Sequence, residues 1–480
     1  MAIKVQQLDS CRWRIPREGA MRTDGLVFAS PAMMQDLRRE QALEQVCNVA
    51  TLPGIVGPSM AMPDIHWGYG FPIGGVAAFD AEQGIVSPGG VGYDINCGVR
   101  LLRSNLNAEG IQPHLDRLAD ALFRNIPTGV GSHHSDFKLS IAEEKRVLTK
   151  GAAWAVEQGF GNENELEYIE NHGMIAAADT EKVSERALER GRSQLGTLGS
   201  GNHFLEIQQV EAIYDQDAAA VLGLYPGQVT VSIHTGSRGL GYQVCDDYLK
   251  IMLKAARKYG IILPDRQLCC APLQSDEARD YMAAMACAAN YAFANRQMIT
   301  SHVRETFEEV LGKGSADLRM ATIYDVCHNI AKWETHSISG QERKLCVHRK
   351  GATRAFPPGH KEIPAVYQSI GQPVLIPGDM GRYSYVLTGT AGAYEETFGS
   401  SCHGAGRVLS RHAAKKAARG RNIIGDLAKQ GILVRAAGRA TLAEEMPEAY
   451  KDVADVVQVI ERAGIGRIVA RLKPMAVVKG

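Results

Sequence analysis

The sequence lacks any apolar run that approaches the ~20 residues of a membrane span, and it lacks repeats and low-complexity tracts. The first residues also lack the apolar core of a signal peptide. The 10 cysteines include no Cys-x-x-Cys pair, which favours reduced thiols over a disulfide framework. We therefore expect a cytoplasmic protein.

An excess of either charge is also absent, because Lys plus Arg and Asp plus Glu both number 53 among the 480 residues. The chain therefore has no global attraction for nucleic acid, and a polyanionic partner would have to meet a local basic patch. The composition, 45% hydrophobic and 22% charged, is that of a globular protein. Because no linker-like segment interrupts it, one continuous domain over residues 1–480 is the simplest interpretation.

Hydrophobic periodicity predicts several secondary-structure elements. It indicates helices over residues 139–157 and 276–310, the second of which is either a projecting arm or a buried long helix. Short β-branched runs predict strands at residues 229–233, 322–326, 344–347, 374–376 and 467–469.

The segment 89–98 is rich in glycine and places a carboxylate, Asp94, three residues before a thiol, Cys97. A carboxylate and a thiolate together suit zinc, iron, cobalt or manganese better than calcium or magnesium. Two ligands do not close a metal site. Taken alone, the pair is better explained by a turn carboxylate and a small buried thiol.

Four histidines stand at strand ends or beside glycine turns. His234 and His328 follow predicted strands, whereas His203 and His403 adjoin glycine turns. Polar residues in such places are typical of enzyme centres. A five-ligand set exceeds one tetrahedral ion and predicts two ions that share the thiolate, a pairing that commonly acts on phosphate esters. The set consists of Asp94, Cys97, His203, His234 and His328.

His403 requires a separate role. It precedes Gly404, Ala405 and Gly406, and a basic segment that we expect to be helical from Val408 follows. A glycine turn that leads into a helix is suited to bind phosphate. An imidazole there could attack phosphorus; alternatively it could hydrogen bond to a bound phosphate or cap the helix.

Blocks at residues 64–74, 90–100, 199–206, 234–241, 328–329 and 403–407 resemble the signature segments of the RtcB family of GTP-dependent RNA-splicing ligases. The resemblance implies a mixed α/β fold with a central cleft for metal and nucleotide. It also implies ligation of RNA 3′-phosphate or 2′,3′-cyclic phosphate ends to 5′-hydroxyl ends, in tRNA splicing or RNA repair. In this scheme GTP guanylylates His403, the RNA 3′-phosphate takes over the GMP, and the 5′-hydroxyl displaces it. Any cyclic phosphate is first opened to a 3′-phosphate by activated water.

The resemblance further implies two Mn²⁺ ions bridged by Cys97, one completed by Asp94 and His203 and the other by His234 and His328. The resemblance also implies that a larger set of residues binds the guanine nucleotide: Asn202, His203, Phe204, Leu205, Glu206, His328, Asn329, Pro377, Gly378, Asp379, Met380, Ser384, His403, Gly404, Ala405, Gly406 and Lys479. Glu206 is suited to accept from the N1–H and N2–H₂ edge of guanine. Asp379 departs from the family, which often has serine there, and a carboxylate beside phosphates is repulsive.

Binding of the negatively charged RNA backbone requires cationic side chains. Arg238, Lys350 and Arg411 are our candidates for contacts with RNA phosphates, because they lie in or beside the site motifs.

Two other functions would use some of the same features. A binuclear metallophosphodiesterase needs the five ligands but neither a nucleophilic His403 nor a guanine-reading acid. A non-catalytic RNA-binding module needs basic patches and leaves the ligands unexplained. The sequence does not decide the physiological RNA, the oligomeric state or the need for an archease-like activator.

Overall fold

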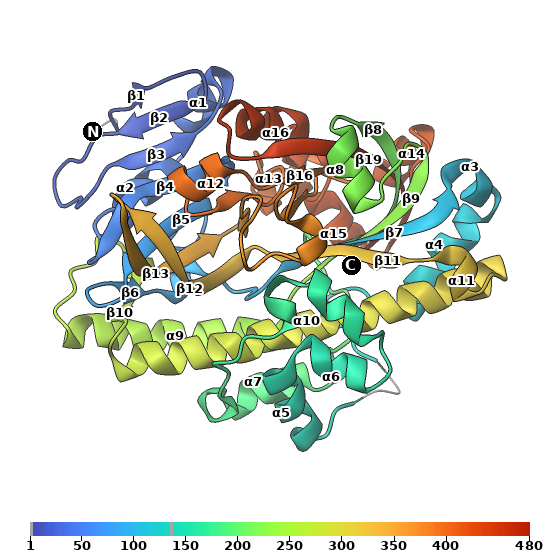
Figure 1. Cartoon of the computed structure of the whole chain (residues 1–480), viewed down its shortest axis with the longest axis horizontal. Coiled ribbons are helices and arrows are strands. Elements are labelled where there is room, and N and C mark those ends of the chain that lie inside the picture. Colours follow the sequence, from blue (N-terminus) through green and yellow to red (C-terminus); the bar gives the residue numbers. More distant parts are fainter. Residues whose placement is uncertain (1–2, 135–137) are drawn as a thin grey trace.

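The computed structural model of the protein describes residues 3–134 and 138–480. Its fold is mixed α/β, as predicted, and is built on two large sheets (Figure 1). The larger sheet has the strand order β11 (Ala321–Cys327), β7 (Gly98–Asn107), β9 (Gln228–Thr235), β8 (Phe204–Ile213), β19 (Arg467–Lys479), β16 (Ser384–Thr388) and β15 (Pro373–Ile376), with β18 (Leu433–Ala436) paired parallel to β19.

The second large sheet carries the N-terminal strands. Its order is β1 (Gln6–Gln7), β2 (Arg12–Ile15), β3 (Gly25–Phe28), β4 (Ile55–His66), β5 (Ile73–Asp80), β13 (Gln341–Lys350) and β12 (Asn329–Ile338). Two short ribbons complete the β structure: β6 (Ile85–Val86) with β10 (Ala271–Pro272), and β14 (Ala352–Arg354) with β17 (Ser400–Cys402).

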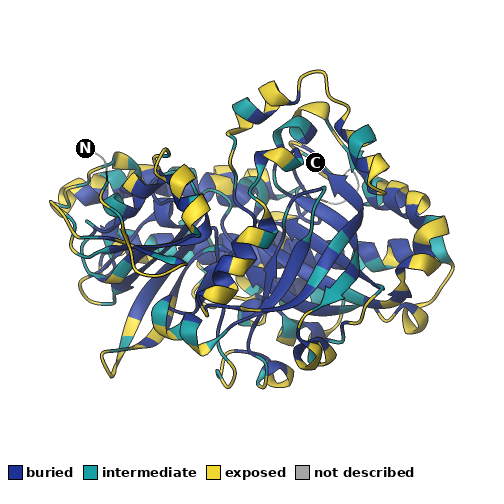
Figure 2. Cartoon of the chain, turned by 90° about the horizontal axis from the view of Figure 1, so that it is seen from above, coloured by how far each residue is buried: buried dark blue, intermediate teal, exposed yellow. Residues whose placement is uncertain are grey.

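Helices surround these sheets, and their exposed faces lie at the periphery while the central strands are buried (Figure 2). They are α1 (Pro31–Leu37), α2 (Ala42–Val49), α3 (Ala108–Ile111), α4 (Leu115–Asn125), α5 (Ile141–Lys150), α6 (Ala152–Glu157), α7 (Glu185–Gly191), α8 (Gln216–Leu222), α9 (Arg238–Lys258), α10 (Asp276–Leu311), α11 (Ser315–Leu318), α12 (Ala391–Glu396), α13 (Arg411–Ala417), α14 (Ile423–Lys429), α15 (Arg439–Glu444) and α16 (Val453–Arg462).

Both faces of the larger sheet are covered, because successive side chains of its strands point to opposite sides. In β7, Leu102 packs with α4 and α10, whereas Val99 and Leu101 pack with α8. Helices α9 and α10 run side by side below the sheets, and α5, α6 and α7 lie on their outer side (Figure 1). The middle of α10, residues 284–300, is buried without interruption.

All five predicted strands are confirmed, within β9, β11, β13, β15 and β19. The helix predicted at 276–310 is confirmed as α10, to within one residue at its end. The helix predicted at 139–157 is two helices, because Gly151 between them has φ of +57°. The helix expected from Val408 begins only at Arg411, where the Ser410 side chain accepts the Ala413 N–H.

Five strands of the larger sheet bring their ends together at one place. The antiparallel register pairs Gly98, at the start of β7, with Thr235 near the end of β9 and with Cys327 at the end of β11. It also pairs Phe204, at the start of β8, with His234 and with Lys479 of β19. Residues next to these positions therefore meet although they are far apart in the sequence.

All 10 cysteines are free thiols, in agreement with the prediction of reduced cysteines. Within the described ranges, no helix combines the length and the apolar character required to cross a bilayer.

Candidate functional site

The five predicted metal ligands meet at the converged strand ends. They form two groups of potential ligand atoms that share the Cys97 thiol: Asp94 with Cys97 and His203, and Cys97 with His234 and His328. Within each group the ligand atoms lie no more than 4.8 Å apart. Cys97 Sγ lies 3.5 Å from His203 Nε2 and 3.3 Å from His234 Nε2.

The ionisation of these groups fits a metal site. Burial lowers the pKa of His234 and of His328 well below the ordinary value, so both imidazoles are neutral and have a lone pair for a ligand bond. Burial opposes ionisation of Asp94, but the adjacent His203, 2.7 Å away, outweighs it and lowers the pKa of this carboxyl to about 2. Burial and Asp94 raise the pKa of Cys97, which a bound divalent cation would counteract.

The orientation of His203 is fixed by its second nitrogen. Its Nδ1 lies 3.0 Å from the carbonyl oxygen of Leu198, to which an Nδ1–H donates. Nε2, which contacts Asp94 at 2.7 Å, is then the nitrogen that would bind a metal ion. Metal-binding histidines are commonly oriented in this way, because they donate their other ring N–H to a backbone carbonyl, a carboxylate or water.

A buried arginine of α10 holds the ligand loop in place. Arg296 is fully buried and forms an ion pair with Asp325 of β11 at 2.8 Å. Its guanidinium also donates to the carbonyl oxygens of Asn96 and Thr235, both at 2.9 Å. Arg296 thus ties the loop that carries Cys97 to the end of β9, next to His234.

His403 lies beside this cluster and is held by Asp64, at the end of β4. Asp64 Oδ2 lies 2.5 Å from His403 Nδ1 and also accepts the backbone N–H of His403 at 3.1 Å. The rings of His403 and His328 have centroids 4.9 Å apart. Gly406, with φ of +74°, lets the loop approach closely, since a Cβ there would lie 2.2 Å from the Asp64 carbonyl oxygen.

A cleft with a cavity volume of about 370 Å³ opens over these residues. Most of the predicted nucleotide positions line it, together with Asp94, Cys97 and His234. The predicted nucleotide residues in its wall are Asn202, Phe204, Glu206, His328, Asn329, Pro377, Gly378, Asp379, Met380, His403, Gly404, Ala405, Gly406 and Lys479.

Within the cleft, Glu206 and Lys479 are both buried. Burial raises the pKa of Glu206 to about 7, although a hydrogen bond from Gln208 and the charge of Lys479 act in the opposite direction. Burial lowers the pKa of Lys479. The Lys479 ammonium lies 5.6 Å from the centroid of the Phe204 ring, so an acid, a cation and an aromatic face meet here.

Three predicted nucleotide positions are placed differently from the others. His203 lies beneath the cleft as a metal-ligand candidate, and it is not among the residues of the cleft wall. Leu205 packs into the core under α4, so only its backbone is available to a ligand. The Ser384 hydroxyl accepts from Gln208, 3.2 Å away, and thus lies behind Glu206.

The Asp379 side chain folds back onto its own turn. Oδ1 accepts the backbone N–H groups of Gly381 and Arg382 at 2.9 and 3.1 Å, and Oδ2 lies 2.8 Å from Arg382 Nε. Burial raises the pKa of Asp379 to about 6. The Arg382 guanidinium and the two backbone N–H groups partly neutralise this carboxylate. The repulsion expected between Asp379 and phosphates is therefore reduced.

The three predicted RNA-binding cations have different surroundings. Arg238 is half-buried, with Nε 3.2 Å from the Thr197 hydroxyl, and Arg411 is exposed at the cleft wall. Lys350 is buried and donates to the carbonyl oxygens of Tyr69 and Gly89, the latter at 3.0 Å. This placement disfavours the prediction that Lys350 contacts RNA phosphate, since its ammonium is already used to join two loops.

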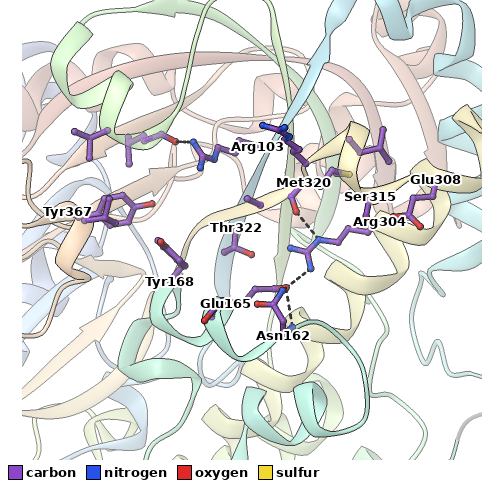
Figure 3. A pocket seen from close by; sticks show the side chains of 17 residues that line it. Arg103, Asn162, Glu165, Tyr168, Arg304, Glu308, Ser315, Met320, Thr322 and Tyr367 are labelled. Carbon is purple, nitrogen blue, oxygen red and sulfur yellow. Dashed lines mark hydrogen bonds and ion pairs between the residues drawn. The ribbon is translucent and has the colours of Figure 1, made fainter. Parts of the chain in front are cut away.

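A second cavity of about 370 Å³ lies at the opposite end of β11, near Thr322 (Figure 3). Arg304 crosses it and pairs with Glu165 at 2.8 Å, while its Nε donates to the Met320 carbonyl oxygen at 3.1 Å. Its wall contains neither histidine nor cysteine among the described residues. The two cavities are thus equal in size, and of the two only the cleft is lined by candidate metal ligands.

The model of the RtcB family, described as tRNA-splicing ligase RtcB, matches residues 45–480. A tRNA-splicing ligase RtcB of Archaeoglobus fulgidus is 55% identical over 478 residues, which is 99% of both chains. That of Thermococcus kodakarensis is 53% identical over 479 residues, 100% of this chain and 99% of its own. An RNA-splicing ligase RtcB of Mycobacterium tuberculosis is 55% identical and covers 91% of this chain and 100% of its own. With nearly the whole chain matched, the protein belongs to the RtcB family.

Proposed function

We propose that the protein is a GTP-dependent RNA ligase that joins 3′-phosphate or 2′,3′-cyclic phosphate ends to 5′-hydroxyl ends, in tRNA splicing or RNA repair. The observation that carries this proposal is the Asp64–His403 pair next to the two-group ligand cluster. A histidine held by a buried carboxylate beside a binuclear metal site is suited to accept a nucleotide covalently.

Asp64 determines which nitrogen of His403 reacts. With Nδ1–H donated to Asp64, the lone pair of His403 resides on Nε2. Attack of Nε2 on the α-phosphorus of GTP forms a P–N bond, breaks the bond to the β-phosphate oxygen and releases pyrophosphate. Asp64 stabilises the positive charge that develops on the imidazole. The RNA 3′-phosphate then displaces His403 to form RNA(3′)pp(5′)G, and the 5′-hydroxyl finally displaces GMP.

The metal ions would be held by the two ligand groups, with Cys97 in both. We assign them as Mn²⁺ by family resemblance, since thiolate and imidazole ligands suit zinc at least as well. When bound, such a pair neutralises charge on phosphate oxygens. Asp94 and the neutral imidazoles of His234 and His328 would hold the ions at the strand ends.

Guanine selection is assigned to Glu206, whose carboxylate matches the N1–H and N2–H₂ donors of guanine, a pattern that adenine lacks. Lys479 and Phe204 complete this end of the cleft. Arg238 and Arg411 remain the candidates for RNA phosphates. A metallophosphodiesterase would use the same metal ligands, but it leaves the Asp64–His403 pair and the buried Glu206 without a role.

The proposal is tested by incubation with α-labelled GTP and Mn²⁺, followed by denaturing electrophoresis and acid treatment. Label should stay on the unsubstituted protein, be released by acid and be absent from His403→Ala, because a phosphoramidate is acid-labile. The matched control is His412→Ala, which removes an exposed histidine of α13. Absence of covalent label under any divalent metal would instead favour a phosphodiesterase.

A further inference from the structure

The second cavity, remote from the ligand cluster, is as large as the cleft, about 370 Å³. Cavities of this size bind small molecules in many proteins. Strand β11 runs from Ala321, in the wall of this cavity, to Cys327, which precedes His328 of the ligand cluster. A seven-residue strand spans roughly 20 Å, so a molecule in the second cavity would not reach the metal ligands.

A buried hydroxyl in the wall of the second cavity lacks a partner. Thr322 is 6% exposed, and its Oγ1 has no hydrogen-bond partner among the residues that the structure describes. A β-bulge at the next residue, Ile323, interrupts the pairing of β11 with β7, and bulges commonly redirect side chains beside functional sites. A buried polar atom without a partner is unfavourable, and a polar ligand atom would satisfy it.

Two arginines of the wall have charges that no acid neutralises. Arg103 and Arg319 each donate to one backbone carbonyl oxygen at 3.3 Å, that of Leu222 and that of Ala316. Neither guanidinium forms an ion pair with any described residue. Arg319 is exposed and has φ of +42°, a left-handed conformation that is unfavourable for residues other than glycine.

The acids of the wall do not cancel these charges. Glu165 is buried and pairs with Arg304 at 2.8 Å, so these two neutralise each other. Glu308 is the other acid that lines the cavity, against Arg103 and Arg319. The wall therefore has a net positive charge and favours an anion.

The opposite side of the cavity is aromatic and apolar. Tyr168 and Tyr367 lie across Thr322 from Arg304 (Figure 3), with ring centroids 5.9 Å apart and ring planes at 67°. Val366, which is 45% exposed, adds apolar surface at the rim. Aromatic surface on one side and unpaired cations in the same wall match a planar ring that carries an anionic group.

We propose that the second cavity is a binding site for a nucleoside monophosphate. Its phosphate faces Arg103 and Arg319, its base lies against Tyr168, and one of its polar atoms bonds to the Thr322 hydroxyl. None of the candidate metal ligands lies in this wall, so the molecule is an additional ligand and not a reactant of the ligation. The inference goes beyond the proposed function and does not depend on it.

The site is tested by calorimetric titration of the intact 480-residue chain with AMP, in excess guanosine to occupy the cleft and without metal ions. AMP should bind at one site, about tenfold more tightly than adenosine or inorganic phosphate, because only AMP reaches both the arginines and the tyrosines. Equal binding of AMP and adenosine, or no AMP binding at about 1 mM, would overturn the proposal.

Thr322→Val locates the site, because valine keeps the shape and removes the hydroxyl. The Kd for AMP should rise about two- to tenfold, the effect of one hydrogen bond. The Tm should stay the same or rise, since the unpartnered buried hydroxyl is gone. The matched control is Thr353→Val in β14, which removes another buried hydroxyl that has no described partner and lies outside this wall. This control should bind AMP like the unsubstituted protein.

Arg319→Gly tests the cation without disturbing the fold, because glycine adopts the φ of this position readily. The Kd for AMP should rise about two- to fivefold, as for loss of an exposed ion pair. Lys313→Ala is the control, since it removes an exposed cation of the same connection that does not line the cavity. AMP binding that is unchanged in both Thr322→Val and Arg319→Gly would place the ligand elsewhere and refute the site.

Failure of this site and failure of the ligase proposal give different results, because the titrations use neither GTP nor RNA. If His403 takes up label from GTP but AMP does not bind, only the second site is overturned. If AMP binding depends on Thr322 but no label is taken up from GTP, the ligation chemistry is overturned and the second site stands.

Discussion

The Asp64 carboxylate selects the nitrogen of His403 that faces the cleft. It accepts from Nδ1, it is fully buried, and it also holds the backbone N–H of the same histidine. A carboxylate that both orients an imidazole and stabilises its positive charge is the arrangement found in hydrolytic triads.

Asp64→Asn tests this arrangement, because asparagine has nearly the same shape without the charge and offers the wrong hydrogen-bonding partner to Nδ1. The single-turnover rate of His403 guanylylation should fall by roughly 10²- to 10⁴-fold. Asp36→Asn, at an exposed site of α1, is the control and should keep the full rate. A full rate in Asp64→Asn would show that the pair is only structural.

Glu206 should make guanine recognition dependent on pH. Its carboxylate must be ionised to accept from guanine, and burial raises its pKa to about 7. Binding of guanosine should therefore weaken as the pH falls below this value, with about a tenfold larger Kd at pH 6 than at pH 8. Calorimetry across this range measures the effect.

The Glu206→Gln variant is the matched comparison, since glutamine does not titrate. Its weaker guanosine binding should be the same at all these pH values. An equal slope in both proteins would assign the pH dependence to another group.

Single-residue roles were predictable only where the sequence carried a local signal. Asp94, Cys97 and the ligand histidines stood at glycine turns and strand ends, and all five come together. The role of Asp64 had no such signal, because its partner His403 lies 339 residues further along the chain.

At the scale of elements, α10 supports the candidate site from beneath. Arg296 connects this helix with β11 through Asp325, and with the ligand loop and β9 through two carbonyl oxygens. Both charged side chains are completely buried, and Asp325 also pairs with the buried Arg100 at 2.7 Å. Removal of Arg296 therefore leaves Asp325 with one of its two cations, and it leaves the carbonyl oxygens of Asn96 and Thr235 without this donor.

Because these buried acceptors lose a charged donor, Arg296→Met should lower the free energy of unfolding by about 2–4 kcal/mol, as measured by urea denaturation. It should also weaken metal binding, because the loop with Cys97 loses its attachment to β9. The control is Arg257→Met, at an exposed position of α9, with an expected change of less than about 0.5 kcal/mol. Unchanged stability of Arg296→Met would mean that the neighbouring hydrogen bonds suffice.

The elements themselves were predictable where periodicity was strong, as in α10 and the five strands. The helix predicted at 139–157 is wrong at its centre because Gly151 adopts φ of +57°, and a Cβ there would lie 2.1 Å from the Gly173 carbonyl oxygen. That close approach arises from tertiary packing, so the hydrophobic periodicity of the sequence could not reveal it. The late start of α13 likewise follows from the Ser410 cap.

At the scale of the whole molecule, the antiparallel register of the larger sheet creates the site. Strands β7, β8, β9 and β11 come from distant parts of the chain, yet their ends meet and bring five ligand residues together. Cys97 occupies the centre and belongs to both groups. The pairing order of the strands was not predictable from the sequence without the family resemblance.

Because Cys97 belongs to both ligand groups, its substitution should reduce the number of bound metal ions more than substitution of Asp94 does. The unsubstituted protein should bind two Mn²⁺ ions, and Asp94→Asn should bind one, because the group of Cys97, His234 and His328 stays intact. Cys97→Ala should lose affinity for both ions. Equilibrium dialysis with elemental analysis measures this, with Cys47→Ala, a half-buried thiol elsewhere, as the control. Two ions retained by Cys97→Ala would contradict the bridge.

The central claim is that this fold stores GMP on His403, and the most direct measurement is peptide mass spectrometry of the protein after incubation with GTP and Mn²⁺. The account predicts one GMP adduct, on the peptide that contains His403, and its disappearance after treatment with acid. An adduct on a lysine or on another histidine, or no adduct in a protein that has bound both metal and GTP, would contradict it.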